Sequence, residues 1–534
     1  MKKVLLLCLW VTLFSGFFVN LTADEAGGGE GTQAADGEPV KTAEDRRLET
    51  IRYGTDSEIT SLIQTLKTEE AYYLDDELIR LAGTSSNRSI LSALFSFFGE
   101  RAREGLEERA LRAISIRGDE GNETVLAAVD YLGNVKAGEA VEVLEELLDG
   151  EERRFMNAAF RSLGRIGGGN PNQADGIAEF LIDYYTNRNG DDENHREIIV
   201  ALGETGSPAG TGFLTDLAGN GDERAGLRMA ALNSLSKIGD PAGLKVILES
   251  VSSQDPNIRS TAVSALGPFS SPETDQAILD AFRDTYYRTR LAAAQAAGKR
   301  KLQSAVPYLS YRAERDEIPQ VKDEAIRALG AIGSSEALKV LNTLFSERKN
   351  ADRVRIISGE MLIQNDPGRY AAQVIRELDD AKQRNQNPLY NGLLRVISTA
   401  RTRAVEDIVR RFLSSGGVIE KSYALDMIAN NRFTDLTKEV EALTDEKNGS
   451  LSRKAKSTLE KLERPPEPEP KPEEPEDPKP VRPEPGQTPP EAESPGDSAE
   501  DPATPPEPPG DTPPDDAPTA DSPAGELPDT EPAK

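Results

Sequence analysis

The sequence predicts an all-α solenoid: a superhelical row of antiparallel helix pairs with disordered segments at both ends. Amphipathic stretches of 10 to 15 residues, separated by Gly, Pro, Ser and Asp, begin near residue 50. A triplet of the type Ala-Leu-Gly recurs at nearly constant spacing, and an acidic, proline-rich composition begins at residue 464. These features divide the chain into the segments 1–23, 24–47, 48–120, 121–463 and 464–534.

Segment 1–23 is predicted to be a cleaved export signal. Two lysines precede an uncharged apolar run over residues 4–19, and the small residue Ala23 stands before Asp24, as signal cleavage requires. The run is short for a membrane-spanning helix. A lipidated Cys8 is disfavoured because apolar residues continue after it. We therefore expect a periplasmic or secreted protein, with an uncleaved membrane anchor as the alternative.

The next two segments are expected to precede the regular array. Residues 24–47 are rich in Gly, Ala and acidic residues and lack an apolar period, which predicts a flexible leader. Residues 48–120 contain helical patterns whose phase does not fit the later repeats, as terminal capping repeats often show. The predicted helices there are Glu58–Lys67, Glu70–Leu81, Arg88–Phe98 and Glu104–Ile116.

Segment 121–463 carries the repeat. The last residues of the triplets from Gly133 to Gly330 lie 31, 39, 33, 31, 31 and 32 positions apart, and the step of 39 contains an insertion near residues 186–196. Beyond Gly330 the register is weaker. A period of this length, made of two amphipathic helices, predicts units that stack and bury one continuous core.

Each repeat unit opens with a capped turn and closes with the triplet. The opening residue, Ser or Asp, can accept hydrogen bonds from free helix N–H groups, and the following Pro has no donor to lose there. We expect the glycine that ends the triplet to form a left-handed C-cap. The clearest openings are Ser207-Pro208, Asp240-Pro241, Ser271-Pro272 and Asp366-Pro367.

Four motifs stand out along the repeats: the Ala-Leu-Gly-Ala-Ile-Gly-Ser stretch 328–334, the turn Ile238-Gly239-Asp240-Pro241, and the pairs Ile258-Arg259 and Val354-Arg355. These motifs resemble the short HEAT repeats, of the kind also found in phycobilisome lyase-like proteins. The resemblance covers residues 120–440 and implies a HEAT/armadillo-like frame whose second helices line the concave face. It implies no particular partner, since such arrays serve many tasks.

Segment 464–534 is predicted to be a disordered acidic tail. It holds 24 prolines, 20 acidic residues and 5 basic residues, and it has no apolar run to bury. Proline density favours polyproline II, which extended over this segment would reach on the order of 200 Å. A possible cell-envelope contact through this tail, to the wall or outer membrane, is the alternative function.

Composition excludes several functions. The formal net charge of −29 disfavours nucleic acid and direct binding to an anionic membrane. Without Cys8 the mature chain has no thiol for disulfides, nucleophilic catalysis or metal binding. The single histidine, His195, lies beside Asp191 and Asp192 in the insertion, where a polar loop is the alternative to a metal or proton-transfer site. We expect no enzyme activity and no catalytic, cofactor or metal residues.

Arginines cluster at the second helices and are the candidate partner-binding residues. They form either a cationic strip for an acidic partner or structural ion pairs between repeats. Tyrosines also recur, at Tyr72-Tyr73, Tyr184-Tyr185, Tyr286-Tyr287, Tyr308 and Tyr311, as exposed anchors or as packing residues. We therefore expect a non-enzymatic scaffold that binds a protein partner. The candidate arginines are Arg224, Arg228, Arg259, Arg288, Arg290, Arg353 and Arg355.

The export prediction is tested by the intact mass of the protein purified from the cells that produce it. Because cleavage is expected after Ala23, the mature chain should begin at Asp24. A mass that retains residues 1–23 would show that the segment stays attached.

Overall fold

The computed structural model describes residues 42–150, 152–188 and 194–464 of the 534-residue chain. Contacts divide the chain into the units Met1–Pro465 and Pro466–Lys534, and every described residue lies in the first. The predicted signal 1–23, the first part of the leader and the tail after Arg464 lie outside the described residues, so those predictions stay predictions. The described part is helical and contains no strand.

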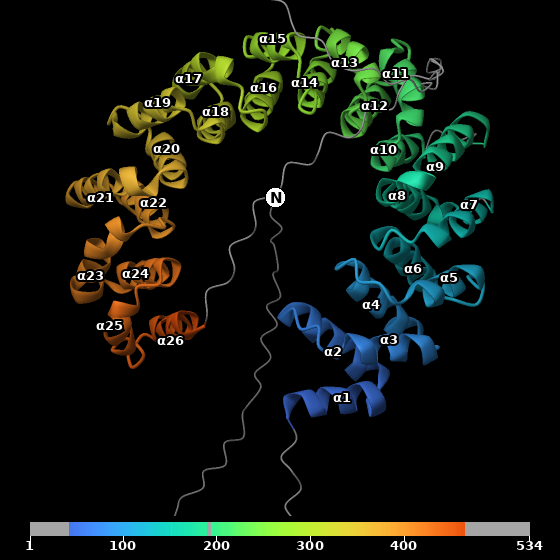
Figure 1. The fold of residues 1–534 in the computed structure, drawn as a ribbon, viewed down its shortest axis with the longest axis horizontal. Coiled ribbons are helices and arrows are strands. Elements are labelled where there is room, and N and C mark those ends of the chain that lie inside the picture. Colours follow the sequence, from blue (N-terminus) through green and yellow to red (C-terminus); the bar gives the residue numbers. More distant parts are fainter. Residues whose placement is uncertain (1–41, 151, 189–193, 465–534) are drawn as a thin grey trace, which may run out of the picture. The chain divides into compact units, whose positions relative to one another are not determined.

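The helices of the first unit alternate between two rows, here called the outer row and the inner row. Figure 1 shows the odd-numbered helices on the outside of a curve and the even-numbered helices on its concave side. The outer row is α1 (Ala43–Tyr53), α3 (Asp75–Thr84), α5 (Glu107–Ser115), α7 (Val141–Asp149), α9 (Pro171–Asp183), α11 (Thr211–Gly219), α13 (Leu244–Ser250), α15 (Pro272–Ala281), α17 (Val306–Arg315), α19 (Ser335–Ser346), α21 (Pro367–Gln383), α23 (Glu406–Ser415) and α25 (Thr437–Glu441).

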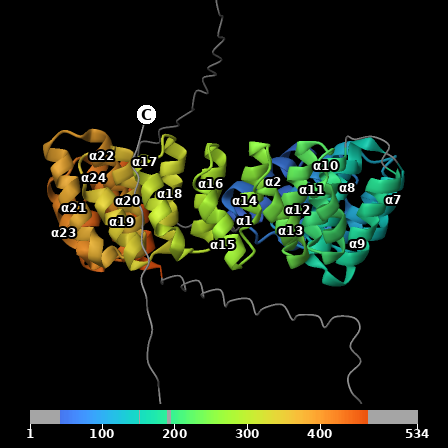
Figure 2. The ribbon, with the colours of Figure 1, turned by 90° about the horizontal axis from the view of Figure 1, so that it is seen from above.

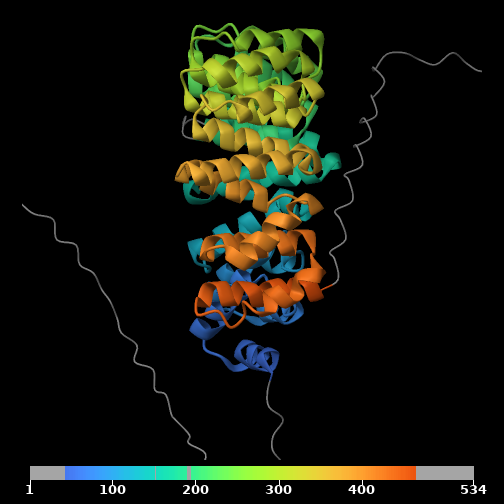
Figure 3. The same cartoon turned by 90° about the vertical axis from the view of Figure 1, so that its left-hand side faces the viewer.

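The inner row consists of the second helix of each pair. Figure 2 shows helices of both rows running across the curve, and Figure 3 shows successive pairs stacked on one another. The inner row is α2 (Asp56–Glu69), α4 (Arg88–Gly99), α6 (Asn122–Asn134), α8 (Arg153–Gly169), α10 (His195–Thr205), α12 (Ala225–Ile238), α14 (Pro256–Ala265), α16 (Tyr287–Lys299), α18 (Pro319–Ile332), α20 (Asp352–Asn365), α22 (Asn387–Ser398), α24 (Val418–Asn431) and α26 (Gly449–Glu463).

One apolar core runs between the two rows. Its buried side chains form a single cluster that extends from Ile51 in α1 to Leu462 in α26. No pair could bury its apolar face alone, so each pair is stabilised by its neighbours. The predicted all-α solenoid of antiparallel helix pairs is confirmed.

The opening turns of the repeats form as the sequence predicts. The Asp240 carboxylate accepts the N–H of Ala242 at 3.0 Å, and the Ser271 hydroxyl accepts the N–H of Thr274 at 3.3 Å. Pro272 is the first residue of α15. Pro241 instead begins a short 3-10 turn that leads into α13.

The glycines that end the triplets are not C-caps, and that prediction is wrong. Gly133 and Gly203 lie inside α6 and α10, where the next inner helix comes too close for a side chain. A Cβ on Gly133 would lie 2.7 Å from the Cα of Ser162 in α8. A Cβ on Gly203 would lie equally close, at 2.7 Å, to the Cα of Ser234 in α12.

The serines at these contacts also bind the backbone of the neighbouring helix. The Ser162 hydroxyl donates to the carbonyl of Val129 at 2.8 Å, and that of Ser234 donates to Ile199 at 2.7 Å. Both hydroxyls are buried, so the hydrogen bonds remove a desolvation cost. The residues that do adopt the left-handed cap follow three positions after the triplet, as Gly206, Gly239 and Gly333 show.

The N-terminal part contains a wider version of this contact. A Cβ on Gly99 in α4 would lie 3.3 Å from the Cα of Tyr131 in α6. The assignment of segment 48–120 to terminal capping repeats stays a prediction. The first helix, α1, also begins inside the predicted flexible leader 24–47, because Thr42 and Asp45 form a capping box at its start.

The close approach of inner helices predicts a strong effect of adding one methyl group. Gly133→Ala should lower the free energy of unfolding by about 1–3 kcal/mol, because the Ser162 backbone must move to make room. The matched control is Gly176→Ala in α9, where a Cβ meets nothing within 4 Å. This control should stabilise the helix by about 0.5–1 kcal/mol. Urea unfolding monitored by circular dichroism measures both, and equal midpoints for the two variants would contradict the packing described.

Candidate partner-binding surface on the inner row

The repeat places polar side chains at one regular position on the solvent side of the inner row. Asn233, Ser264 and Gln295 lie 31 residues apart, one each on α12, α14 and α16. Each stands three residues before the end of its triplet and is exposed. Since the helices stack in register, the three side chains fall in one line across the surface.

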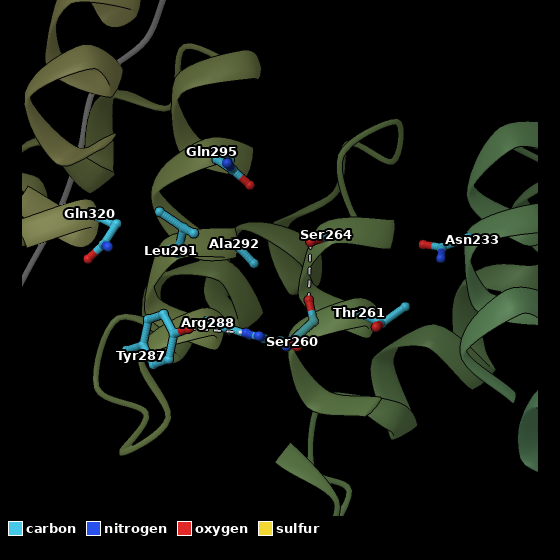
Figure 4. A pocket seen from close by; sticks show the side chains of 10 residues that line it. All are labelled: Asn233, Ser260, Thr261, Ser264, Tyr287, Arg288, Leu291, Ala292, Gln295 and Gln320. Carbon is cyan, nitrogen blue, oxygen red and sulfur yellow. Dashed lines mark hydrogen bonds between the residues drawn. The ribbon is translucent and has the colours of Figure 1, made fainter. Parts of the chain in front are cut away.

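These three residues line a hollow of about 370 Å³, here called the inner hollow. Figure 4 shows it between α12, α14, α16 and α18, with the Arg288 side chain extending toward Ser260. The complete lining is Asn233, Ser260, Thr261, Ser264, Tyr287, Arg288, Leu291, Ala292, Gln295 and Gln320.

The lining of the inner hollow is polar and apolar in turn, with a single charged side chain. Its amide groups carry both donors and acceptors, the Ser260 and Ser264 hydroxyls already donate to backbone carbonyls of α14, and Leu291 and Ala292 add apolar surface. Arg288 is the only charged residue in the lining. Its Nε–H donates to the Tyr287 hydroxyl oxygen at 3.2 Å, and this hydrogen bond raises the pKa of the guanidinium. The hollow therefore combines neutral hydrogen-bonding groups with one permanent positive charge.

Two other predicted arginines are structural bridges between repeats. Arg290 forms two parallel hydrogen bonds to the Asp316 carboxylate, at 2.7 and 2.9 Å. Its third nitrogen, Nη1, donates to the carbonyls of Asp284 and Thr285 at 3.0 and 3.1 Å. Arg259, 31 residues earlier, repeats the arrangement with the Asp284 carboxylate, at 2.8 and 3.0 Å. Each guanidinium thus joins the loop before its own helix to the start of the next inner helix.

The carboxylates of these bridges also hold the turns that lead into the inner helices. Asp316 accepts the N–H of Ile318 at 3.0 Å. Burial alone would raise the pKa of Asp316, but the hydrogen bonds from Arg290 and Ile318 outweigh it and hold the pKa below its usual range. The pKa of Asp316 is lower in the folded protein than in the unfolded chain. Its ionised carboxylate therefore stabilises the fold at pH values above the pKa of the unfolded chain. The contribution is lost as the pH falls through the folded value.

Two of the remaining predicted arginines make contacts inside the fold, and the other two are exposed. Arg355 is buried, donates to the Phe345 carbonyl at 2.9 Å and pairs with Glu377 at 2.5 Å. Arg228 is half-buried and donates to the Ala218 carbonyl at 3.0 Å.

Arg353 and Arg224 are both exposed. The exposed side chain of Arg353 reaches back to the buried Asp323 of α18, at 2.7 Å from its Nε. Arg224 stands at the start of α12 with its Nε 3.8 Å from Glu223.

Of the seven predicted arginines, therefore, Arg288 is the one in the lining of the inner hollow. A role for any of them in binding a partner stays a prediction. The sequence analysis missed the neutral residues Asn233, Ser264 and Gln295. Their spacing of 31 residues, which equals the repeat length, is the signal in the sequence that could have identified them.

His195 is the first residue of α10 and contacts an aromatic ring. Its ring stacks on Tyr185 with centroids 4.0 Å apart, at the start of α10. Among the residues with described positions, no group of three His, Cys, Asp or Glu side chains is arranged to hold a metal ion. The neighbouring Asp191 and Asp192 lie outside the described residues.

The same residues hold no helix that is both long enough and apolar enough to span a membrane. This finding covers the helices from α1 to α26.

The arginine bridges predict a contrast between two neighbouring residues of α16. Arg290→Gln should lower the free energy of unfolding by about 1.5–3 kcal/mol, because it removes charge-assisted hydrogen bonds to the buried Asp316 carboxylate and leaves Arg312, at 3.4 Å, as its remaining cation. Arg288→Gln, at an exposed position two residues earlier, should change it by less than about 0.5 kcal/mol. Equal losses in a urea titration at neutral pH would show that the bridge is not what holds these repeats together.

Comparisons with solved structures return proteins of low identity. A crystal structure of Kap121p is 13% identical, with a TM-score of 0.39 over 78% of this chain and 53% of that chain. A structure of Kap121p bound to the extreme C-terminus of the protein phosphatase Cdc14p is 12% identical, with a TM-score of 0.39 over 79% of this chain and 54% of the other. Importin beta, crystallised in a polyethylene glycol condition, is 14% identical, with a TM-score of 0.40 over 78% and 69%.

The match spans about half of the Kap121p chain. TM-scores this low say nothing about what the present chain binds. The comparison with curated proteins gave no match.

One family model covers most of the helical array. The model of the spirochaete HEAT repeat protein matches residues 51–458, from α1 into α26. The predicted resemblance to HEAT repeats is confirmed, while the closer likeness to the phycobilisome lyase-like kind stays a prediction. The chain belongs to the spirochaete HEAT repeat protein family.

Proposed function

We propose that this protein is a non-enzymatic scaffold that binds a segment of a protein partner along the inner row, with the inner hollow as its centre. The observation that carries the proposal is the line of Asn233, Ser264 and Gln295 across three neighbouring repeats. A surface that repeats every helix pair suits a partner that also repeats at a constant step, which an extended peptide or a helix does.

The polarity of the inner hollow favours a peptide backbone over a small apolar ligand. Small-molecule sites are mostly apolar and enclosed, whereas seven of the ten residues that line this open hollow carry an amide or a hydroxyl group. An extended peptide presents unpaired N–H and C=O groups on both sides. Side chains such as Gln295 and Gln320 can satisfy either kind, since each amide carries a donor and an acceptor.

Arg288 supports an acidic residue in the bound segment. Its side chain is exposed and lies within the lining, which contains no carboxylate. A guanidinium can bind a carboxylate through two parallel hydrogen bonds. One acidic side chain placed over Arg288 would therefore fix the register of the segment along the row.

The rigidity of the frame supports binding at low entropic cost. The arginine bridges at Arg259 and Arg290 join α14, α16 and α18, which are three of the four helices around the inner hollow. Side chains on such fixed helices lose little freedom when a partner binds.

The proposed place of action is outside the cytoplasm, and it rests on the composition of residues 1–23. Those residues and the tail lie outside the described part, so contact of segment 464–534 with the cell envelope also stays a prediction of its composition.

The test is site-specific photo-crosslinking of the full chain inside the cells that make it. A photoreactive amino acid at Gln295 should capture a discrete protein partner, because this side chain faces the proposed binding path. The matched control places the same amino acid at Lys245 of α13, an exposed residue of the outer row. Mass spectrometry of the crosslinked bands identifies the captured protein.

Two further outcomes decide the proposal. Arg288→Gln should reduce the yield of the Gln295 crosslink without changing the amount of folded protein. The same bands from Gln295 and Lys245, or no band above background from Gln295, would refute binding along the inner row.

A further inference from the structure

A second surface of different chemistry lies on the outer row, along α17. Tyr308, Tyr311, Arg312 and Arg315 follow one another at helical spacing of three, one and three residues, which places them on one side of the helix. Pro307 precedes them at the start of α17. This side of α17 is therefore a stripe of aromatic rings and guanidinium groups.

The stripe borders a hollow of about 410 Å³, here called the outer hollow. Its other wall comes from Phe282 and Arg283, which directly follow α15. The complete lining is Phe282, Arg283, Pro307, Tyr308, Tyr311 and Arg312. Three aromatic rings and a proline thus meet two arginines in one place.

The three aromatic rings of the outer hollow differ in how much of their surface is exposed to solvent. Phe282 is almost fully buried, and its ring stacks on that of Tyr308 with centroids 5.7 Å apart. Tyr311, one turn later, keeps 53% of its surface exposed. The core therefore fixes Tyr308 in place, while about half of the Tyr311 surface stays open to solvent.

The positive charge around these rings is incompletely neutralised within the described chain. Arg312 and Arg315 stand 5.2 and 5.7 Å from the centre of the Tyr311 ring. Arg312 contacts Asp316 at 3.4 Å, a carboxylate that the Arg290 bridge already uses. Arg315 makes no ion pair among the described residues and is exposed. Free cationic capacity remains beside Tyr311.

Arg283 completes the cationic side on the other wall. It lies 5.4 Å from the centre of the Tyr308 ring, and its only described carboxylate partner is Asp280, at 3.5 Å between exposed side chains. An exposed ion pair of this kind contributes little free energy. An incoming carboxylate can therefore replace Asp280 as the partner of Arg283.

We propose that the outer hollow binds an acidic, proline-rich peptide segment in the polyproline II conformation. Aromatic-lined grooves accept this helix because proline rings pack on the aromatic faces and the ordering cost is already low. Its acidic side chains would meet Arg283 and Arg315, which flank the rings. The outer hollow and the inner hollow lie on different rows of helices. A result that refutes binding at one of them therefore leaves the proposal for the other unaffected.

The chain itself supplies a suitable probe sequence. Residues 465–480 read Pro-Pro-Glu-Pro-Glu-Pro-Lys-Pro-Glu-Glu-Pro-Glu-Asp-Pro-Lys-Pro. A synthetic, fluorescently labelled peptide of this sequence is added to the chain ended at Pro465. That protein retains the whole compact unit Met1–Pro465, and its folding is verified by circular dichroism.

Fluorescence anisotropy then measures the affinity. Saturable binding is expected, and Tyr311→Ala should weaken it at least about fivefold, because an exposed aromatic anchor typically contributes more than a neighbouring contact. The control variant is Tyr53→Ala in α1, a tyrosine with 83% exposure, which should bind the peptide as well as the parent does.

A second peptide separates charge from ring packing. Replacing each Glu and Asp by Gln and Asn keeps the prolines, and binding should weaken several-fold and lose most of its salt dependence. The absence of saturable binding to the acidic peptide would overturn the proposal. Equal affinity of the parent and the Tyr311→Ala variant, or equal affinity for both peptides, would overturn it as well.

Discussion

The structure depends on the distance between neighbouring inner helices. Where Gly133 faces Ser162 and Gly203 faces Ser234, the backbones approach so closely that a Cβ would lie 2.7 Å from the opposing Cα. At this distance a serine hydroxyl reaches the carbonyl of the neighbouring helix, as Ser162 reaches Val129. Dispersion attraction and a buried hydrogen bond therefore act at the same point. Each such contact sets the separation and the register of two repeats.

Further along the array charge is added to this contact. A Cβ on Gly298 of α16 would lie 3.0 Å from the Cα of Ala328 in α18, and between α14 and α18 the guanidinium groups of Arg259 and Arg290 also join successive repeats through carboxylates that precede inner helices. Because both partners of the Arg290 bridge are buried, either one alone would be costly. The regular contacts beneath the surface explain why the solvent side repeats too. Polar residues spaced 31 apart form a line only if the helices below keep their register.

The sequence predicted the helix pairs, the opening turns and the approximate repeat, because these depend on local chemistry such as capping by Ser271. It did not predict the role of Gly133, since the reason for that glycine lies on another helix about 30 residues away. Its spacing suggested a cap, which in fact follows three positions after each triplet, at Gly206 and Gly239. The contact of Gly99 with α6 likewise depends on a residue of another helix, so local sequence chemistry gave no sign of it.

Charge was a poor guide to the candidate site for a related reason. Arg259, Arg290 and Arg355 were chosen because arginines on second helices suggest a binding strip, and the structure turns their guanidinium groups toward carboxylates of neighbouring repeats. These arginines differ from Arg288 in how deeply the side chain is buried. Burial depends on the packing of adjacent helix pairs, which the sequence alone does not give. The neutral residues Asn233 and Gln295 carry no individual signal, so their importance emerges from their common place in the repeat.

The central claim is that close contact within the inner row holds the array together, and native-state hydrogen exchange of the full chain tests it most directly. If the claim holds, the amides around Gly133, Ser162 and Gly203 are among the slowest to exchange, and they exchange together as one cooperative unit. The helix α13 of the outer row should exchange faster. Inner-row amides that exchange as fast as those of α13, or each helix independently of its neighbours, would contradict the account.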